Sequence, residues 1–138
     1  MKISVGTDII EIDRIKDAVS NQKFINRIYT TKEISYCEET RNMKFQHYGA
    51  RFAGKEATFK AISAFLTTPE KFSWKNIEIT NDAYGKPHVE IINYEDFGLK
   101  NIKLDISLSH VKDYAVAYVT AYKEDEELLW IILNNIVT

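Results

Sequence analysis

The segment RFAGKEATFK, residues 51–60, carries four charged side chains whose types and spacing could do chemistry. Glu56 and Lys60 are four residues apart, as are Arg51 and Lys55, so each pair shares one side of a helix. Glu followed by Lys at this spacing stabilises a helix by only about 0.2–0.5 kcal/mol, whereas two bases repel each other unless an anion lies between them. The four charges are therefore either a solvated helix face or a site for a metal ion and a phosphate.

A carboxylate stands in a similarly suggestive place near the start of the chain. Asp8 belongs to GTDIIEIDRI, residues 6–15, where it follows a strand-like pattern and is followed at once by apolar residues. An aspartate there either caps a helix or serves as a ligand for a hard cation.

Hydroxyl and imidazole groups end a third segment, DISLSH, residues 105–110. Strand alternation places Ser107 and Ser109 on one face, with His110 at the end of the strand. These groups suit hydrogen bonding to an anionic ligand, although a lone histidine is more often structural. No Gly-x-Ser-x-Gly elbow is present, which argues against a nucleophilic triad.

The elements that must position these residues follow from periodicity. We expect a strand over 2–9, helical residues over 12–29 broken near 20–22, a capping box from Thr30 to Glu33, helices over 31–39 and 44–65, and strands over 74–80, 87–92, 104–109 and 114–122. Gly85 stands at the turn of the hairpin between the second and third strands. Helices followed by antiparallel strands predict an α+β fold, with an antiparallel sheet packed against the long central helix.

Composition limits the classes of function. With 138 residues and 45% hydrophobic content, the chain suits a single compact domain. Its net charge of −2 argues against a nucleic-acid binder. Residues 41–60 nevertheless hold five bases against Glu56 alone, which favours an acidic partner or a phosphorylated ligand at that place.

The cysteine content and the distribution of apolar residues limit the classes of function further. Cys37 is the only cysteine, so neither an intramolecular disulfide nor a thiolate zinc site is expected. Acidic residues interrupt the N-terminal segment and no apolar run approaches about 20 residues, so we expect a cytoplasmic location and no membrane association. We expect one domain over 1–122 and a C-terminal extension over 123–138 with an apolar segment, which either covers the core or contacts another subunit.

Together the segments resemble holo-acyl-carrier-protein synthase, the short, trimeric class of the 4′-phosphopantetheinyl transferase superfamily. The resemblance rests on VGTDIIEIDRI (5–15), RFAGKEATFKA (51–61), ND-x-x-GKP (81–87) and DISLSH (105–110), in this order and at these separations. It covers residues 1 to about 122, and the first two motifs in combination are its most specific part.

The resemblance implies an activity and its catalytic residues. Members of the family transfer 4′-phosphopantetheine from coenzyme A to a serine hydroxyl of an apo acyl carrier protein and release adenosine 3′,5′-bisphosphate. Carried over, Asp8 and Glu56 become ligands of Mg²⁺, which prefers oxygen donors, and Lys60 meets the diphosphate of coenzyme A. Glu56 or a water on the metal is the implied acceptor of the serine proton.

The resemblance also implies binding residues and partners. Family positions around the coenzyme A nucleotide correspond to Arg51, Lys55, Gly85, Lys86, Pro87, Ser107, Ser109 and His110. Positions that receive the acidic carrier protein correspond best to Arg14, and more loosely to Lys16, Lys23, Arg27 and Lys44. A homotrimer with active sites at the subunit interfaces is implied.

One segment departs from the family pattern. After KEATFKA the family usually carries a Phe-Gly-Thr-Gly element, whereas this chain reads ISAF at 62–65, without two glycines that permit close backbone approach. The departure favours an alternative, a non-catalytic oligomeric module of the same fold that binds coenzyme A or nucleotide. A third interpretation is an interaction protein whose apolar tail docks a partner helix.

Overall fold

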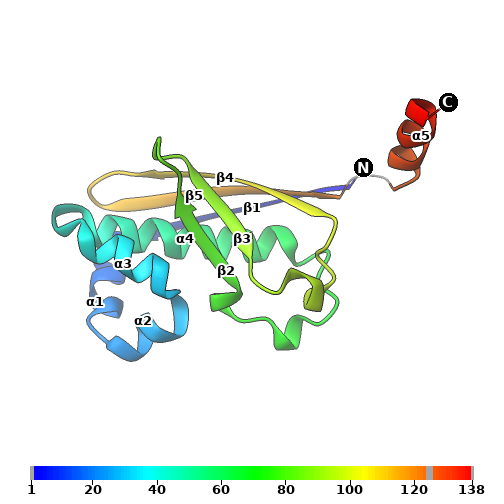
Figure 1. The fold of residues 1–138 in the computed structure, drawn as a ribbon. Helices are drawn as coiled ribbons and strands as arrows, with labels where there is room; N and C mark the ends of the chain where they lie inside the picture. The colour runs from blue at the N-terminus through cyan, green and yellow to red at the C-terminus, as the bar shows by residue number, and fades with distance from the viewer. Residues whose placement is uncertain (1, 124–125, 138) are drawn as a thin grey trace.

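Figure 1 shows the order of the helices and strands in the computed structural model, which describes residues 2–123 and 126–137. The fold is α+β, and its principal elements are β1 (Lys2–Glu11), α1 (Ile12–Val19), α2 (Gln22–Ile28), α3 (Thr31–Glu39), α4 (Lys44–Ile62), β2 (Ile77–Asn81), β3 (Pro87–Ile91), β4 (Ile102–His110), β5 (Tyr114–Lys123) and α5 (Glu126–Val137). Single turns of 3₁₀ helix occupy Arg41–Met43, Pro69–Lys71, Trp74–Asn76 and Tyr94–Phe97.

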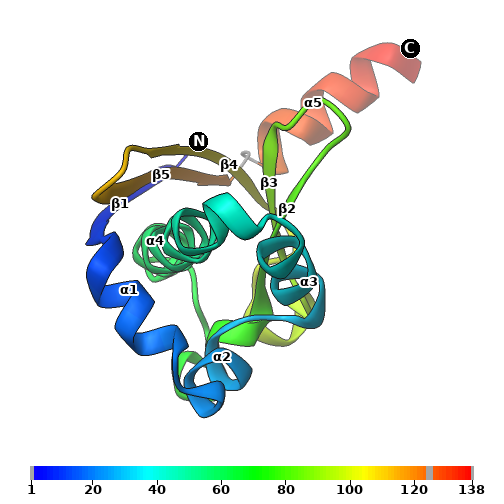
Figure 2. The ribbon, with the colours of Figure 1, turned by 90° about the vertical axis from the view of Figure 1, so that its left-hand side faces the viewer.

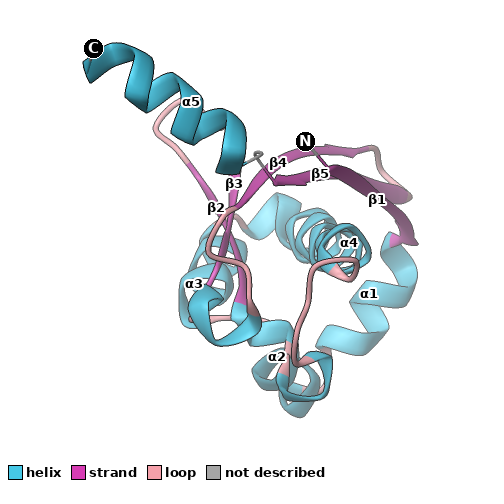
Figure 3. Ribbon diagram, turned by 90° about the vertical axis from the view of Figure 1, so that its right-hand side faces the viewer, coloured by secondary structure: helices cyan, strands magenta, loops and turns pink. Residues whose placement is uncertain are grey.

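The predicted α+β fold with antiparallel strands packed against the long helix is confirmed, and the strands form two sheets. One sheet has the order β1-β5-β4, and the other is the β2-β3 hairpin. The view in Figure 2 looks along α4, which lies at the centre with the three-stranded sheet over one side. Helices α1 and α3 and the β2-β3 hairpin surround the rest of α4, and Figure 3 shows the same arrangement from the opposite side. The long helix is thus covered on most sides.

Small residues let α4 approach the three-stranded sheet closely. Ala53, Ala57 and Ala61 recur every four residues on α4 and are fully buried. A side chain at Gly6 of β1 would collide with the backbone carbonyl of Ala57, so only glycine fits there. This contact fixes the distance between the strand that carries Asp8 and the helix that carries Glu56.

Several local predictions are confirmed. The helical stretch breaks at 20–21, and Thr30 and Glu33 form a capping box at the start of α3. Gly85 has φ +83° in the hairpin turn, which only glycine adopts easily. Several boundaries differ from the prediction: β1 continues to Glu11 rather than 9, α4 ends at Ile62 rather than 65, and Trp74–Asn76 forms a 3₁₀ turn before β2. β4 is longer than predicted, over Ile102–His110.

The C-terminal segment forms α5, which does not cover the core. Its described apolar side chains remain accessible, with Trp130 at 66% and Ile136 at 75% of full exposure, and Figure 1 shows the helix standing apart from the domain. The prediction that this segment covers the core of its own chain is therefore wrong. A contact with another subunit stays a prediction. Among the described residues, no helix combines the length and apolarity needed to span a membrane.

Candidate active site

The predicted site residues of α4 face two different sides of the helix. Arg51 and Glu56 are five residues apart, which places them roughly 140° apart around the axis. Glu56 and Lys60 face β1, where Lys60 contacts Asp8 and Thr7. Arg51 instead bonds to Asn81 at the end of β2. The site is thus built as two separate half-sites within one chain.

The first half-site joins β1 to the C-terminal half of α4. Asp8 lies within β1, which continues to Glu11, so the interpretation of Asp8 as a helix cap is wrong. The Lys60 Nζ atom lies 3.3 Å from Asp8 Oδ1 and donates to the Thr7 carbonyl oxygen at 3.0 Å. The lysine therefore pairs across to the strand rather than along the helix with Glu56.

Electrostatics at this half-site are unbalanced. The pKa of Glu56 is raised, first by burial and then by the neighbouring carboxylate of Asp8, while Lys60 opposes the shift. Asp8 disfavours the negative charge of Glu56, and Lys60 beside them is still 53% exposed, so this half-site leaves room for a further cation. Their oxygen donors are those that Mg²⁺ prefers, so the residues present fit this ion.

The described residues contain no cluster of three or more His, Cys, Asp or Glu side chains that could hold a metal. A pair of carboxylates is nevertheless a normal protein contribution to a Mg²⁺ site, because substrate phosphates and waters complete the octahedron.

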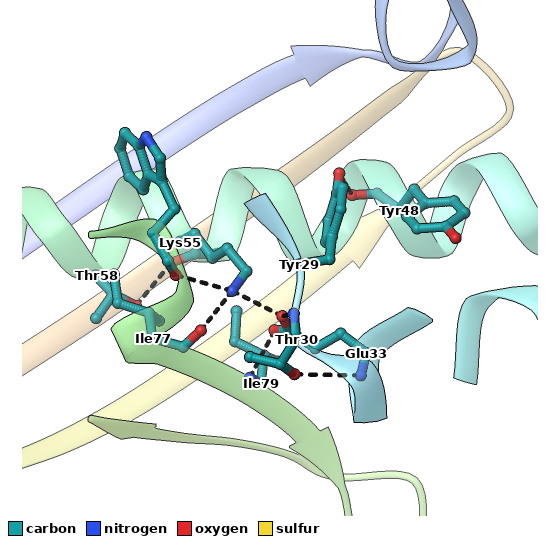
Figure 4. A network of polar contacts seen from close by, with 10 residues as sticks. Tyr29, Thr30, Glu33, Tyr48, Lys55, Thr58, Ile77 and Ile79 are labelled. Atoms are coloured by element: carbon teal, nitrogen blue, oxygen red, sulfur yellow. Dashed lines mark hydrogen bonds and ion pairs between the residues drawn. The ribbon is translucent and has the colours of Figure 1, made fainter. Parts of the chain in front are cut away.

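Lys55, one residue before Glu56, belongs to a different environment. Its side chain is buried, and Nζ forms an ion pair with Glu33 Oε1 at 2.7 Å. The ammonium also donates to the carbonyl oxygens of Trp74 and Ile77, as Figure 4 shows. Burial lowers the pKa of Lys55, an effect that Glu33 opposes.

Glu33 completes this network from α3. Its Oε1 accepts from the Thr30 backbone N–H at 2.8 Å, and its Oε2 accepts from the Ile79 N–H at 2.9 Å. Three elements, α3, α4 and β2, are thereby joined through one ion pair. The ammonium of Lys55 is fully used inside the protein, so we leave Lys55 out of the coenzyme A site that the sequence suggests for it.

The second half-site gathers around Arg51. Its guanidinium lies 3.9 Å from the ring centre of Tyr36, and Nη2 donates to Asn81 Oδ1 at 2.6 Å. The side chain is buried, yet its Nε atom has no hydrogen-bond partner. A buried donor without an acceptor is costly, and an anion would satisfy it.

The predicted nucleotide-binding turn borders Arg51 through Asn81. Asn81 donates from Nδ2 to the Gly85 carbonyl oxygen at 2.9 Å, and Lys86 follows in the exposed turn. Pro87 begins β3. The turn is held in shape by Asp82, whose Oδ1 accepts the backbone N–H of Lys86 at 3.0 Å.

The residues of DISLSH lie on β4 as alternation predicts. Ser107 and Ser109 are exposed, whereas Ile106 is buried on the opposite face. His110 ends the strand, and its ring centre lies 6.0 Å from that of His47 on α4. His110 therefore approaches the helix one turn before Arg51.

The basic residues suggested for carrier-protein binding lie along the N-terminal helices. Those on α1 and α2 are exposed, namely Arg14, Lys16, Lys23 and Arg27. Lys44 at the start of α4 is half-buried and forms an ion pair with Glu38 at 3.0 Å. Lys44 is thus the least available of the five.

Most of the sequence matches the model of one known protein family. Residues 4–119 match the family model described as the 4′-phosphopantetheinyl transferase superfamily. The chain belongs to this superfamily. It is accordingly an enzyme of the phosphopantetheinyl transferase type.

Individual relatives narrow the class within the superfamily. The chain is 44% identical over 125 residues to a holo-[acyl-carrier-protein] synthase of Ruminiclostridium cellulolyticum, covering 86% of this chain and 90% of the relative. A synthase of Protochlamydia amoebophila is 41% identical over 120 residues, covering 86% and 96%.

Solved structures agree with these relatives. The holo-(acyl-carrier-protein) synthase of Bacillus anthracis, in complex with CoA (3′,5′-ADP), is 31% identical with a TM-score of 0.72, covering 88% of this chain and 96% of that one. The synthase of Neisseria meningitidis is also 31% identical, with a TM-score of 0.73 and coverage of 87% and 98%.

Sequence reasoning missed several residues that shape this transferase. The partner of Lys55 was not foreseen, because Glu33 signals only a capping box until the tertiary structure adds Ile79 and Lys55 to its contacts. Tyr36, His47 and Asn81 gather around Arg51, and only Asn81 lies within a motif of the sequence. Helical spacing offers the one usable signal for His47, which precedes Arg51 by four residues.

Proposed function

We propose that this chain transfers 4′-phosphopantetheine from coenzyme A to a serine hydroxyl of an apo acyl carrier protein, with Mg²⁺, and releases adenosine 3′,5′-bisphosphate. The observation that carries the proposal is the meeting of Asp8, Glu56 and Lys60 between β1 and α4. Two carboxylates and one ammonium at one place match what a diphosphate with a divalent cation requires.

Asp8 and Glu56 would hold the cation. When bound, Mg²⁺ supplies positive charge to the diphosphate and to the leaving group. Lys60, which extends from α4 to the carboxylate of Asp8, binds the same diphosphate as a point charge. Most of the acceleration then comes from positioning and preorganised charge.

The transfer step balances without further reactants. The serine oxygen of the carrier attacks the phosphorus that bears the pantetheine arm, and the bond between that phosphorus and the bridging diphosphate oxygen breaks. Adenosine 3′,5′-bisphosphate leaves with that oxygen. Glu56, the carboxylate of this half-site on α4, accepts the serine proton.

The second half-site binds the nucleotide. Arg51 offers a buried N–H donor without an acceptor, and Gly85, Lys86 and Pro87 form the adjoining turn. His110 adds an imidazole group from β4 on the side of α4, whereas Ser107 and Ser109 lie on the opposite, exposed face of that strand. Because the two half-sites face different sides of α4, one ligand reaches both most easily between two copies of the chain.

An apolar sheet face supports a homotrimer with such shared sites. Side chains that point away from α4 on β1 and β5 are large and exposed, with Ile3 at 62%, Val5 at 53%, Ile9 at 64% and Tyr118 at 50%. A contiguous apolar face of this kind is typical of subunit contacts. Sedimentation equilibrium measures the assembly: a trimer is expected, and a monomer at micromolar concentration would contradict it.

Exposed bases on α1 and α2 would receive the acidic carrier protein. Arg14 and Lys16 on α1 and Lys23 and Arg27 on α2 present positive charge to the solvent. Charge of this kind mainly raises the rate of association, and the effect decreases with salt.

One assay tests the proposal. The protein is incubated with coenzyme A, Mg²⁺ and an apo acyl carrier protein, and the carrier is then weighed by mass spectrometry. We expect a gain of one phosphopantetheine that disappears when EDTA replaces Mg²⁺. Absence of any gain across several apo carriers, while coenzyme A still binds, would contradict the proposal and favour the non-catalytic module.

A further inference from the structure

The C-terminal helix α5 has an apolar side that no described residue of its own chain covers. Ile132, Leu133 and Ile136 share this side, because they are three or four residues apart, and all three are exposed. A helix shorter than about 12–15 residues is only marginally stable in water without packing, and α5 has 12. The helix therefore needs a surface to pack against.

An open groove of about 390 Å³ lies between the two sheets, at the C-terminal end of α4. β3 and β4 border it, and each is an edge strand of its sheet. The apolar part of its lining consists of Ile62, Val89, Ile91, Leu99, Ile102 and Leu104. Edge strands expose unpaired backbone groups, and proteins commonly cover such edges with a helix or loop. An apolar helix is thus the kind of structure that this groove fits.

The α5 helix of the same chain is badly placed for this groove. Lys123, the last residue of β5, pairs with Ile102 of the groove. β5 runs outward at that point, whereas the groove extends back along β4 to Leu104. To enter it, α5 would have to reverse direction within the two residues that separate it from β5, and Figure 1 shows it standing apart instead. A second copy of the chain can offer its α5 without such a reversal.

Charge at the two surfaces is complementary. Four consecutive acidic residues occupy positions 124–127, where β5 passes into α5. Lys100 lines the groove, and Lys103 is exposed nearby on β4, against one acid, Glu90, in the lining. Opposite charges of this kind steer association and fix the orientation of the partners.

We propose that α5 of one copy docks through Ile132, Leu133 and Ile136 into the groove between β3 and β4 of a second copy. Each copy offers one helix and one groove, so the contact is head-to-tail and closes into a ring in the homotrimer proposed above. Ile62, which lines the groove, also begins the ISAF segment, so the departure from the family pattern lies against the neighbouring helix. The contact does not depend on the transfer reaction.

Disulfide trapping between two different chains tests the contact. Chains with Ile132→Cys and chains with Glu90→Cys, carrying different tags, are co-expressed and oxidised mildly with copper phenanthroline. Peptide mass spectrometry should find a disulfide that joins positions 132 and 90 of the two chains, while the buried Cys37 stays reduced. Asn134→Cys is the matched control: it lies on the opposite side of α5, about 200° from Ile132, and should lose the cross-link.

A labelling rate gives a second readout that does not require disulfide geometry. The thiol of Glu90→Cys is labelled with a maleimide, alone and combined with Leu133→Lys. Because burial of one leucine side chain is worth tenfold or more in affinity, the labelling rate should rise about tenfold when the lysine replaces it. Asn134→Lys is the control and should label as slowly as Glu90→Cys alone.

Four outcomes would overturn the inference. The first is a cross-link only between positions 132 of two copies, which would mean that the helices associate with each other. The second is a disulfide within one chain when Ile132→Cys and Glu90→Cys are combined, with none between chains. The third is equal cross-linking from positions 132 and 134, and the fourth is an unchanged labelling rate in Leu133→Lys. Failure of carrier modification would contradict the proposed function without affecting this contact.

Discussion

Lys55 and Glu56 are neighbours in α4, yet they belong to opposite kinds of environment. Lys55 points into a closed region where Glu33 and two carbonyl groups satisfy its ammonium. Glu56 points toward β1, where burial and then Asp8 raise its pKa while solvent still reaches the site. A charged side chain in a helix has a structural role where the protein itself supplies its counter-charge and hydrogen-bond partners. Where the protein leaves charge unbalanced, a ligand is expected.

The largest expected effect comes from Glu56→Gln. Removing the carboxylate that accepts the proton and holds the cation should lower the transfer rate by about 10³-fold. The folded protein should be at least as stable at neutral pH, because a raised pKa means that the ionised carboxylate disfavours folding there. Carrier mass and thermal unfolding measure the two effects, and normal transfer by the variant would remove Glu56 from its role.

Lys55→Met should act on stability instead. The substitution keeps the apolar length of the side chain but leaves Glu33 buried without its ion-pair partner. Breaking a buried pair in this way costs about 3–5 kcal/mol in the free energy of unfolding. Urea denaturation measures the loss. A change below 1 kcal/mol would show that the pair does not join α3, α4 and β2 as described.

Lys60→Met is the matched control on the same helix. Lys60 is 53% exposed and contacts Asp8 at 3.3 Å, so its loss should cost less than about 1 kcal/mol of stability. Its absence from the diphosphate site should lower kcat/KM about 10–100-fold. If instead Lys60→Met unfolded the protein and Lys55→Met only reduced activity, the distinction between the two sides of α4 would be reversed.

The smallest expected effect concerns Cys37 in the closed region. Burial raises the pKa of its thiol to about 12, with Arg51 opposing the shift. The thiolate fraction at pH 8 is then minimal, and Ellman's reagent should label the folded protein only on the timescale of unfolding. Rapid labelling of the native protein would indicate that this region opens far more readily than its packing suggests.

The local parts of this molecule could be predicted from its sequence. The capping box at Thr30 and Glu33, the hairpin turn at Gly85 and the alternation of Ser107 and Ser109 each depend on a few adjacent residues, and all are confirmed. Asp8, Glu56 and Lys60 do meet, because a strand and a helix with small facing residues pack closely.

The remaining features depend on contacts between distant segments. Nothing near Lys55 in the sequence indicates that Glu33, 22 positions earlier, will neutralise it, so the lysine resembled a phosphate ligand. The division of the strands into two sheets likewise follows from how β2 packs against α3 and α4 while β3 pairs with β2, which no period in the sequence reveals. The role of Asp8 was ambiguous because the sequence does not show that the strand continues past this residue to Glu11.

Divalent-cation binding is the most direct test of a cation shared by Asp8 and Glu56. Mn²⁺ serves as a paramagnetic probe and is titrated, with coenzyme A present, into the wild-type protein, Asp8→Asn, Glu56→Gln and the surface control Asp13→Asn. We expect one strongly bound ion per chain in the wild-type protein and the control, and its loss in both site variants. Equal Mn²⁺ binding by all four proteins would contradict the shared cation between Asp8 and Glu56.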